Sequence, residues 1–412
     1  VPDQETPEGP RLAAELRRMV RSEDATRPVT SGCDRIAAGY NGFNQGVDVL
    51  GYNYKPFEYG KFHATNPTQP VYGSETASTL SSRGEYFFPV SEDKAGGKAD
   101  FQMSSYDLYA PPWATTPDTE FSAQDKNPFV AGEFVWTGFD YLGEPTPYNE
   151  DLTILSNFSD PAAMARMKKE LAELGKIQSP ARSSYFGILD LAGLPKDRYY
   201  LYQSRWRPEL PMAHILPHWN WPERMGQITP VHVYTSGDAA ELFLNGKSLG
   251  LKRKGPFKYR LRWDEVTYQP GELKVVAYRD GKKWATDTVK TTGSAAKLIL
   301  EPDRNGITAD GQDLSFVTVT VADKNGLLVP RSKNHIQFTI TGPGEIIAVD
   351  NGDATSFEPF QASDRNAYNG KALVVVRSSP GKHENIVLTA KSAGLDSATV
   401  KIKSQFNCNA KQ

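Results

Sequence analysis

Cysteine is scarce in this sequence: Cys33 and Cys408 are the two cysteines among 412 residues. They lie far apart, in no spacing that is typical of a metal site or a redox motif, and they do not decide a cellular compartment. Long apolar runs are absent as well, since no stretch approaches the roughly 20 residues that a membrane-spanning helix needs. The sequence therefore argues against a cysteine-based metal centre, and it predicts no membrane partner.

An excess of charge of either sign is also missing, because 47 Lys and Arg residues are balanced by 49 Asp and Glu residues. Without a basic excess nothing indicates a nucleic-acid partner, and without an acidic block nothing indicates a charged tail. The length indicates two to four domains, and a hydrophobic content of 39% is enough for ordinary cores. Aromatic residues reach 11%, a content that suits surfaces for sugar stacking, although packed cores also account for it.

The first half of the chain is expected to alternate helices with short buried strands. Apolar residues at helical spacing predict helices at three places: 8–24, 162–175 and 196–206. Short continuous apolar runs predict four strands: one that begins at 27–30, and then 47–54, 71–75 and 129–136. Runs of this kind are typical of a parallel sheet that is buried on both faces. Four such strands are too few to close a barrel, which needs eight.

The texture changes after about residue 210, where strand patterns follow one another with turn signals between them. Asn245-Gly246 and Asp280-Gly281 are strong signals for two-residue hairpin turns. We expect a small antiparallel β-sandwich over residues 210–293 and an immunoglobulin-like β-sandwich over 294–406, with a polar tail at 407–412. The predicted fold class is thus multidomain α/β plus all-β: the C-terminal half of a TIM (β/α)8 barrel over 1–209, followed by two sandwiches.

Glu75 has the most informative position in the chain, at the expected C-terminal end of the strand that begins at Val71. Barrels of alternating strands and helices carry their catalytic groups at such strand ends. The alternative is a glutamate that simply faces solvent. Two other expected strands end nearby in Asn53-Tyr54 and in Trp136. Together these strand ends supply a carboxylate, a phenol that can hydrogen-bond to it and an aromatic platform for a sugar ring.

Several segments carry a resemblance to a known family: Gly-Tyr-Asn-Tyr at 51–54, Tyr-Gly-Ser-Glu-Thr at 72–76, the long run from Gly132 to Tyr148, and the segments 193–200 and 216–221. On these motifs the chain resembles the β-galactosidases of glycoside hydrolase family 2. The resemblance covers nearly the whole chain and makes the two sandwiches accessory C-terminal domains. It implies a retaining exo-β-glycosidase that uses two carboxylates about 5–5.5 Å apart.

The resemblance implies a role for individual residues of this sequence. Glu75 matches the nucleophile, Tyr54 the tyrosine that hydrogen-bonds to the nucleophile and supports it, and Trp136 a tryptophan of the substrate platform. Asn53 is expected as a neighbour of the bound sugar.

The loop beyond Trp136 is expected to border the substrate site. Asp140 either contacts substrate or braces this loop, and Glu144 is expected to contact substrate or to shape the pocket wall. No metal and no cofactor is expected to be required.

The second carboxylate, the acid/base, is expected just before Val1. In the family it follows an Asn at the end of the fourth barrel strand, and a segment similar to Val1–Gln4 comes after it, then a helix and a segment similar to Thr26–Thr30. Glu5 and Glu8 are not assigned this role, because they lie in the connection to the first helix. We therefore expect the missing N-terminal half of the enzyme as a partner, and almost no hydrolysis by this chain alone.

Other candidate residues have a structural interpretation that we favour. Glu133 is expected in an ion pair beneath the pocket rather than as a third catalytic carboxylate. His214 and His218 are spaced like a metal pair, but Pro217 breaks any helix that would place them on one face.

A tryptophan pair and a basic run are also expected to have structural roles. Trp219 and Trp221 are expected to anchor the barrel to the first sandwich rather than to bind sugar. The basic run Lys252-Arg253-Lys254 is expected to be a solvated strand edge.

The sugar is less well defined than the reaction. The family's galactosidases place a His shortly after the nucleophile, whereas this chain has Thr76-Ala77-Ser78, and the Asn-x-Lys pair of β-glucuronidases is not evident. Galactose is therefore expected on overall resemblance, with a β-glucuronidase or a β-mannosidase as alternatives. A non-catalytic carbohydrate-binding or scaffolding fragment is the alternative from another class. The resemblance further implies a periplasmic or secreted bacterial protein acting on a β-linked oligosaccharide or glycan, and a homo-oligomer is left open.

Overall fold

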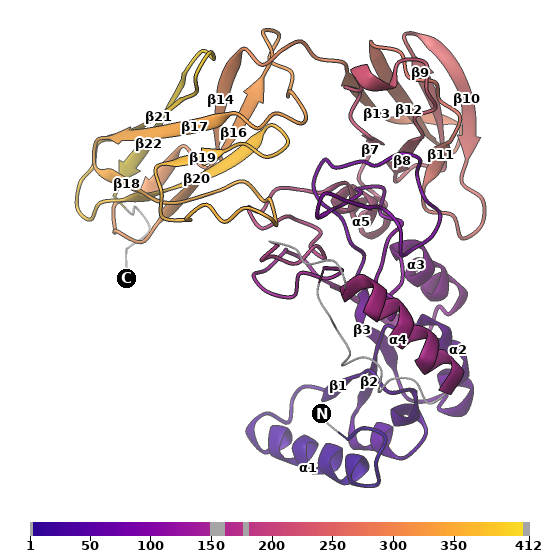
Figure 1. Cartoon of the computed structure of the whole chain (residues 1–412). Coiled ribbons are helices and arrows are strands. Elements are labelled where there is room, and N and C mark those ends of the chain that lie inside the picture. The colour runs from indigo at the N-terminus through magenta and orange to yellow at the C-terminus, as the bar shows by residue number, and fades with distance from the viewer. Residues whose placement is uncertain (1–2, 149–160, 176–180, 407–412) are drawn as a thin grey trace. The chain divides into compact units, whose positions relative to one another are not determined.

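The computed structural model describes residues 3–148, 161–175 and 181–406 (Figure 1). The chain divides into two compact units, of which the first comprises residues 1–81, 86–188 and 253–261, and the second 82–85, 189–252 and 262–412. The α-helices are α1 (Glu8–Glu23), α2 (Tyr59–Thr65), α3 (Pro117–Lys126), α4 (Pro161–Gly175) and α5 (Asp197–Trp206). Among the described helices, none has the length and apolar character needed to cross a bilayer.

Strands make up more of the chain than helices do. They are β1 (Thr30–Cys33), β2 (Val49–Asn53), β3 (Val71–Ala77), β4 (Lys98–Ala99), β5 (Gln102–Met103), β6 (Val130–Trp136), β7 (Ala213–Leu216), β8 (Val231–Thr235), β9 (Ala239–Leu244), β10 (Lys247–Arg253), β11 (Leu261–Trp263), β12 (Glu272–Arg279), β13 (Lys282–Lys290), β14 (Lys297–Pro302), β15 (Gly306–Thr308), β16 (Leu314–Ala322), β17 (His335–Thr341), β18 (Gly344–Asp350), β19 (Asp364–Asn366), β20 (Lys371–Ser378), β21 (Asn385–Lys391) and β22 (Ala398–Gln405).

The first unit is built on a parallel sheet of order β1-β2-β3-β6, with helical segments in each connection. Figure 1 shows this sheet beside α2 and α3. Apolar side chains of the strands and of the segments between them form one buried cluster: Ala13, Cys33, Ala38, Phe43, Val47, Leu50, Tyr52, Tyr59, Phe62 and Val71. The three helices predicted from the sequence are confirmed to within two residues at each end.

Two details of the predicted sheet are wrong. The third strand does not end at Glu75, because Thr76 pairs with Val135 and Ala77 with Trp136, and the ladder continues to Ala77. The sheet is also not buried on both faces throughout. β6 is an outer strand of the described sheet, and Phe134 on this strand is 68% exposed.

Between this sheet and the helices lies a buried carboxyl group. Glu120 of α3 is completely buried and accepts hydrogen bonds from the Tyr59 hydroxyl at 2.6 Å and from Gln124 at 3.1 Å, both at Oε1. Its Oε2 has no hydrogen-bond partner in the described part of the chain. Burial is the main cause that raises the pKa of Glu120 to about 7, and the neighbouring Glu133 adds to it.

The segment 253–261 joins β10 to β11 and packs on α3. Arg260 is 9% exposed, forms an ion pair with Asp118 and donates to the carbonyl oxygens of Tyr106 and Asp107. Tyr259 donates to Asp125 at 2.5 Å. A buried guanidinium with one carboxylate and two carbonyl partners fixes this segment to the first unit.

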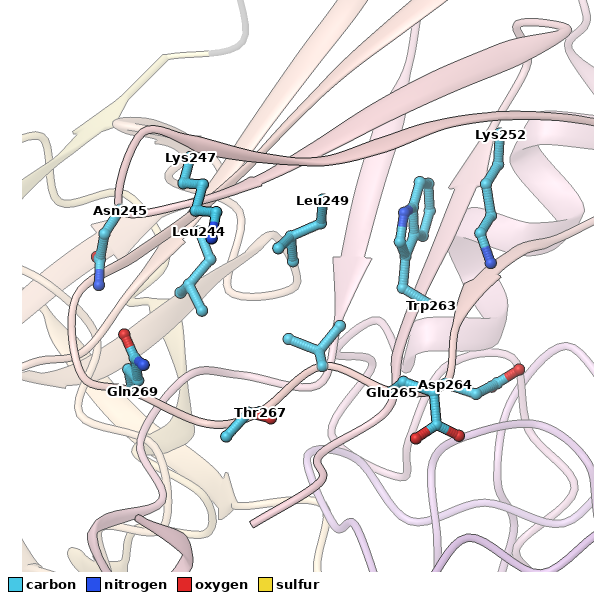
Figure 2. A pocket seen from close by; sticks show the side chains of 11 residues that line it. Leu244, Asn245, Lys247, Leu249, Lys252, Trp263, Asp264, Glu265, Thr267 and Gln269 are labelled. Carbon is cyan, nitrogen blue, oxygen red and sulfur yellow. The ribbon is translucent and has the colours of Figure 1, made fainter. Parts of the chain in front are cut away.

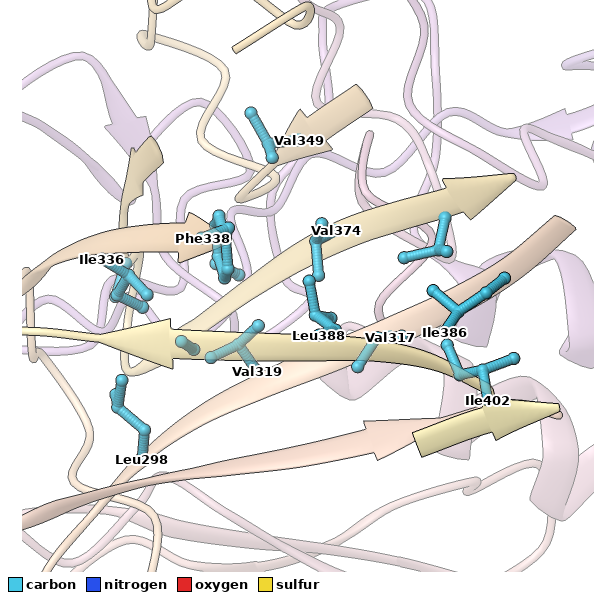
Figure 3. Packing of buried hydrophobic residues seen from close by; sticks show 14 of the residues in the cluster. Leu298, Val317, Val319, Ile336, Phe338, Val349, Val374, Ile386, Leu388 and Ile402 are labelled. Carbon is cyan, nitrogen blue, oxygen red and sulfur yellow. The ribbon is translucent and has the colours of Figure 1, made fainter. Parts of the chain in front are cut away.

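The second unit is sheet-rich and sandwich-like. Residues 213–290 form sheets of order β10-β9-β12-β13 and β11-β8-β7, and later residues form sheets of order β14-β16-β20-β18 and β15-β22-β21-β17-β19. The last two sheets share an apolar core that includes Val317, Phe338 and Ile402 (Figure 3). Both predicted hairpin turns are confirmed, with positive φ at Asn245-Gly246 and at Asp280-Gly281, as such turns require.

The predicted domain boundaries stay a prediction, although the segment 253–261, expected in the first sandwich, groups with the first unit. Sequence reasoning assigned no strand to eight segments: β4, β5, β7, β11, β15, β18, β19 and β22. In β22, exposed residues alternate with less exposed ones, and only Ile402 and Ser404 of this strand are buried. Cys408 lies outside the described residues.

We predict that Glu120→Gln removes a pH-dependent loss of stability. The pKa of this carboxyl lies near 4.5 in the unfolded chain and is raised to about 7 in the folded one. The folded state therefore holds the proton longer, and stability falls as pH rises between these two values, by about 3 kcal/mol in total. The difference in urea midpoint between Glu120→Gln and the native chain should grow in favour of the variant from pH 4.5 to pH 7.

The exposed Glu23→Gln on α1 serves as the control and should show no such change. A constant difference between Glu120→Gln and the native chain across this range would contradict the prediction.

We predict that Arg260→Met destabilises the first unit by about 2–3 kcal/mol, because Asp118 and two carbonyl groups lose their charged partner. Hydrogen exchange of the β3 amides measures this. Arg377→Met is the matched control, since Arg377 pairs with Glu345 where both side chains are well exposed and should contribute less than about 1 kcal/mol. Equal effects of the two substitutions would refute the proposed role of Arg260.

Candidate active site

Glu75 and Tyr54 meet at the ends of two neighbouring parallel strands. The Tyr54 hydroxyl donates to Glu75 Oε2 at 2.8 Å, and the Tyr54 amide donates to the Glu75 carbonyl at the same distance. The Tyr54 hydroxyl in turn accepts a hydrogen bond from Ser78 Oγ at 2.9 Å. The phenol thus has a donor on one side and a carboxylate acceptor on the other, which fixes the direction of its own proton.

The strand geometry explains why these side chains meet. Residue Tyr52 of β2 pairs with Gly73, but the next residue, Asn53, pairs with Glu75, so β3 contains one extra residue. The pairing with β6 shows the same shift, since Glu133 pairs with Gly73 and Val135 with Thr76. A bulge of this kind redirects the side chains that follow it, and bulges are frequent beside active sites.

The backbone beyond both strands is unusual. Tyr54, Ala77 and Ser78 all have positive φ values, of 56°, 63° and 56°. Side-chain-bearing residues rarely adopt this left-handed conformation, at a cost of about 1–3 kcal/mol each. Such conformations persist where the surroundings impose them, and here they bring the Tyr54 and Ser78 hydroxyl groups together at Glu75.

Asn53 also lies beside the carboxylate. Its Oδ1 accepts a hydrogen bond from Ser74 Oγ at 2.7 Å, so its amide nitrogen is left to donate, and a side-chain hydrogen bond from Asn53 favours the ionised form of Glu75. Burial nevertheless raises the pKa of Glu75 above its ordinary value, and the charges of Asp34 and Glu144 add to this effect. Burial likewise raises the pKa of Tyr54 well above its ordinary value, so the phenol keeps its proton.

Trp136 ends β6 and is linked to the loop that follows. Its indole donates to the Tyr141 hydroxyl at 3.1 Å, the two rings meet edge to face, and Tyr141 donates to Glu144. The charge of Glu144 also acts on Glu75. Asp140 has a different environment: it is 7% exposed and accepts hydrogen bonds from the Gly187 amide and from Ser184, which favours the role of a brace.

Sequence reasoning missed three residues of this site. Asp34 follows β1 directly and is a strand-end carboxylate that acts on Glu75, so the rule applied to Glu75 could have found it. Ser78 gave no signal, because its contact with Tyr54 depends on the turn after β3. Trp113 belongs to a small buried cluster against which Tyr54 packs, and it lies in the long connection between β3 and α3, where no sequence pattern indicated a contact with Tyr54.

The other candidate residues lie elsewhere or serve the fold. Glu133 accepts a hydrogen bond from Thr76 at 2.7 Å. His214 lies 2.6 Å from Asp197, and His218 stacks on Trp221.

The two tryptophans of the expected linker are inside the protein. Trp219 and Trp221 are 0% and 4% exposed, which leaves no face for a sugar. Lys252 lies on the exposed strand β10 and donates to a backbone carbonyl. Within the described residues, no group of three or more His, Cys, Asp or Glu side chains is arranged to hold a metal ion.

Comparisons with known proteins agree on one family. Residues 298–401 match the family model "Glycoside hydrolase family 2 C-terminal domain 5", and residues 226–285 match "Domain of unknown function (DUF4982)". The chain is 40% identical over 403 residues to "Beta-galactosidase BoGH2A" of Bacteroides ovatus, covering 96% of this chain and 44% of that protein. It is 34% identical to a "Putative beta-glucuronidase" of Formosa agariphila, covering 93% of this chain and 36% of the relative.

Solved structures give the same result. A β-glycosidase from Bacteroides vulgatus superposes with a TM-score of 0.77 at 27% identity, covering 97% of this chain and 49% of that one. A family 2 glycosyl hydrolase from Bacteroides cellulosilyticus also superposes with a TM-score of 0.77, at 28% identity over 98% of this chain and 48% of that one. The chain thus spans about half the length of the relatives it matches. Taken with the arrangement around Glu75, these similarities establish that the chain belongs to glycoside hydrolase family 2.

Proposed function

We propose that this chain is part of a retaining exo-β-glycosidase in which Glu75 is the nucleophile. The observation that carries the proposal is the hydrogen bond of 2.8 Å from Tyr54 to Glu75 Oε2 at adjoining strand ends. A nucleophilic carboxylate needs one oxygen held and the other directed at the sugar, and a protonated phenol supplies that hold.

In the proposed reaction, Glu75 attacks the anomeric carbon and forms a glycosyl-enzyme, which water then hydrolyses with retention. Tyr54 holds Oε2 during the attack and stabilises the carboxylate when it leaves. Asn53 donates to the same carboxylate. Trp136 forms part of the platform for the sugar, with Glu144 close by, and the acid/base comes from residues outside this chain.

We further propose that the parallel sheet is half of a (β/α)8 barrel. Its strands are neighbours in the order in which they occur along the chain, and helical segments connect them. Barrels have this sequential order, whereas doubly wound sheets reverse it at a switch point. Because four strands are half of a barrel and the chain spans 44% of its relative BoGH2A, we expect little turnover by the chain alone.

A terminal β-galactoside is the substrate that we propose first. The relative at 40% identity bears the name of a β-galactosidase, whereas the relatives named as β-glucuronidases reach at most 34%. A β-glucuronide is the second candidate, because one such relative covers 93% of the chain. We also propose that the protein is secreted or periplasmic.

We predict that 2,4-dinitrophenyl 2-deoxy-2-fluoro-β-galactoside labels Glu75. The dinitrophenolate leaves without protonation, so the glycosyl-enzyme can form without an acid/base, and fluorine slows its hydrolysis. Mass spectrometry of the digested chain should show the adduct on the peptide that contains Glu75. The corresponding glucuronide and mannoside should label more slowly, and faster labelling by either would reassign the sugar.

Variants define the outcome of this experiment. Glu75→Gln should abolish labelling, whereas Glu23→Gln on the exposed part of α1 should leave it unchanged. Labelling by none of the three reagents would favour a non-catalytic carbohydrate-binding chain. Normal turnover of p-nitrophenyl β-galactoside by this chain, lost in Glu75→Gln, would refute the expected inactivity of the chain alone.

We predict that Tyr54→Phe shifts the acid limb of the labelling rate to higher pH by about one unit. Tyr54 donates to the ionised form of Glu75 and thereby lowers its pKa, so removal of the hydroxyl raises the pKa further. Rates measured from pH 4 to pH 8 test this. Tyr72→Phe is the matched control, since the Tyr72 hydroxyl accepts a hydrogen bond from Thr30 and lies outside the set of groups that shift Glu75. An unchanged or downward-shifted limb in Tyr54→Phe would contradict the proposed support of Glu75.

A further inference from the structure

The second unit contains a groove that the reaction at Glu75 does not use. It has a volume of about 740 Å³ and is lined by residues of the β9–β10 hairpin, of β10 and of the chain from Trp263 to Gln269 (Figure 2). This volume falls within the range of about 300–1,000 Å³ that small-molecule sites occupy. The groove lies inside residues 226–285, the part of the chain that matches a domain of unknown function.

The middle of the groove is apolar and its margins are polar. Figure 2 shows Leu244 and Leu249 between β10 and the chain that carries Thr267. Asn245 and Gln269 lie at one end, and Lys252, Trp263, Asp264 and Glu265 lie at the other.

Several polar side chains of the margin are already held in place. Asn245 donates to the Pro270 carbonyl and accepts from the Glu272 amide. Lys252 donates to the Arg262 carbonyl, and Asp264 pairs with Arg262. These bonds fix the two sides of the groove before any ligand arrives, which lowers the entropic cost of binding.

Other lining groups have no protein partner. The side chains of Lys247, Glu265, Thr267 and Gln269 make no hydrogen bond or ion pair with the described residues. All four side chains are exposed, so they are accessible to a ligand in the groove.

The charges of the margin indicate the class of ligand. Lys247 and Lys252 balance Asp264 and Glu265, so the groove has no net charge to favour an anion or a cation. Pyranose rings present apolar C–H faces and hydroxyl groups that both donate and accept, which suits an apolar floor with uncommitted polar groups around it. We infer that this groove binds a short neutral oligosaccharide, at a site separate from Glu75. This inference does not depend on Glu75 being a nucleophile.

Isothermal titration of the 412-residue chain tests the inference with three probes: β-1,4-galactotetraose, cellotetraose and the acidic tetragalacturonate. At least one neutral probe should bind saturably, and tetragalacturonate should bind at least tenfold more weakly. Thr267→Arg should fill the groove and weaken binding of the neutral probe at least tenfold.

Matched controls separate this groove from other sites. Thr288→Arg places the same side chain on an exposed position of β13, outside the groove, and should leave binding unchanged. Trp136→Ala provides the comparison at the Glu75 site, and the part of the binding that Thr267→Arg removes should remain in this variant.

Three results would overturn the inference: no binding of either neutral probe, preferred binding of tetragalacturonate, or binding that Trp136→Ala abolishes and Thr267→Arg does not. The last result would assign sugar binding to the Glu75 site.

Discussion

The candidate site depends on one extra residue in β3. That residue shifts the pairing of β3 with both neighbouring strands, so that Glu75 pairs with Asn53 and Thr76 with Val135. Without it, every side chain beyond Gly73 would point to the opposite face, because side chains alternate along a strand. The hydrogen bond from Tyr54, the one from Asn53 and the buried contact of Thr76 with Glu133 all require the shifted register.

The sequence could predict elements and strand ends, but not the register. Alternating patterns and two-residue turns led to the sheets and hairpins, and the position of Glu75 after Val71 and Tyr72 led to the carboxylate. The residue types around the bulge do not reveal it, because a serine such as Ser74 is also common at the end of an ordinary strand. For the same reason the strand appeared to end at Glu75, and the contributions of Ser78 and Trp113, which depend on the turn and the long connection after β3, could not be anticipated.

Burial raises the pKa of two carboxyl groups of the first unit, Glu75 and Glu120, but their surroundings differ. Glu75 is partly buried but accepts hydrogen bonds from Tyr54 and Asn53, which offset part of the cost of its charge. Glu120 is completely buried, one of its oxygens has no partner among the described residues, and the charge of Glu133 acts on it, so the neutral form is favoured up to about pH 7. Each carboxyl group accepts hydrogen bonds from two side chains, so the two groups differ in burial and in the placement of those donors: both donors of Glu120 reach Oε1, and its Oε2 has no partner among the described residues.

The chain passes from the first unit to the second and back more than once, at residues 82–85, 189 and 253–261. Domain boundaries usually fall in exposed linkers that few contacts cross. Here, removal of the chain after residue 210 would take Arg260 away from Asp118 and leave this carboxylate without its guanidinium partner. Proteolysis or engineering that treats the sandwich part as a removable accessory would therefore damage the unit that carries Glu75.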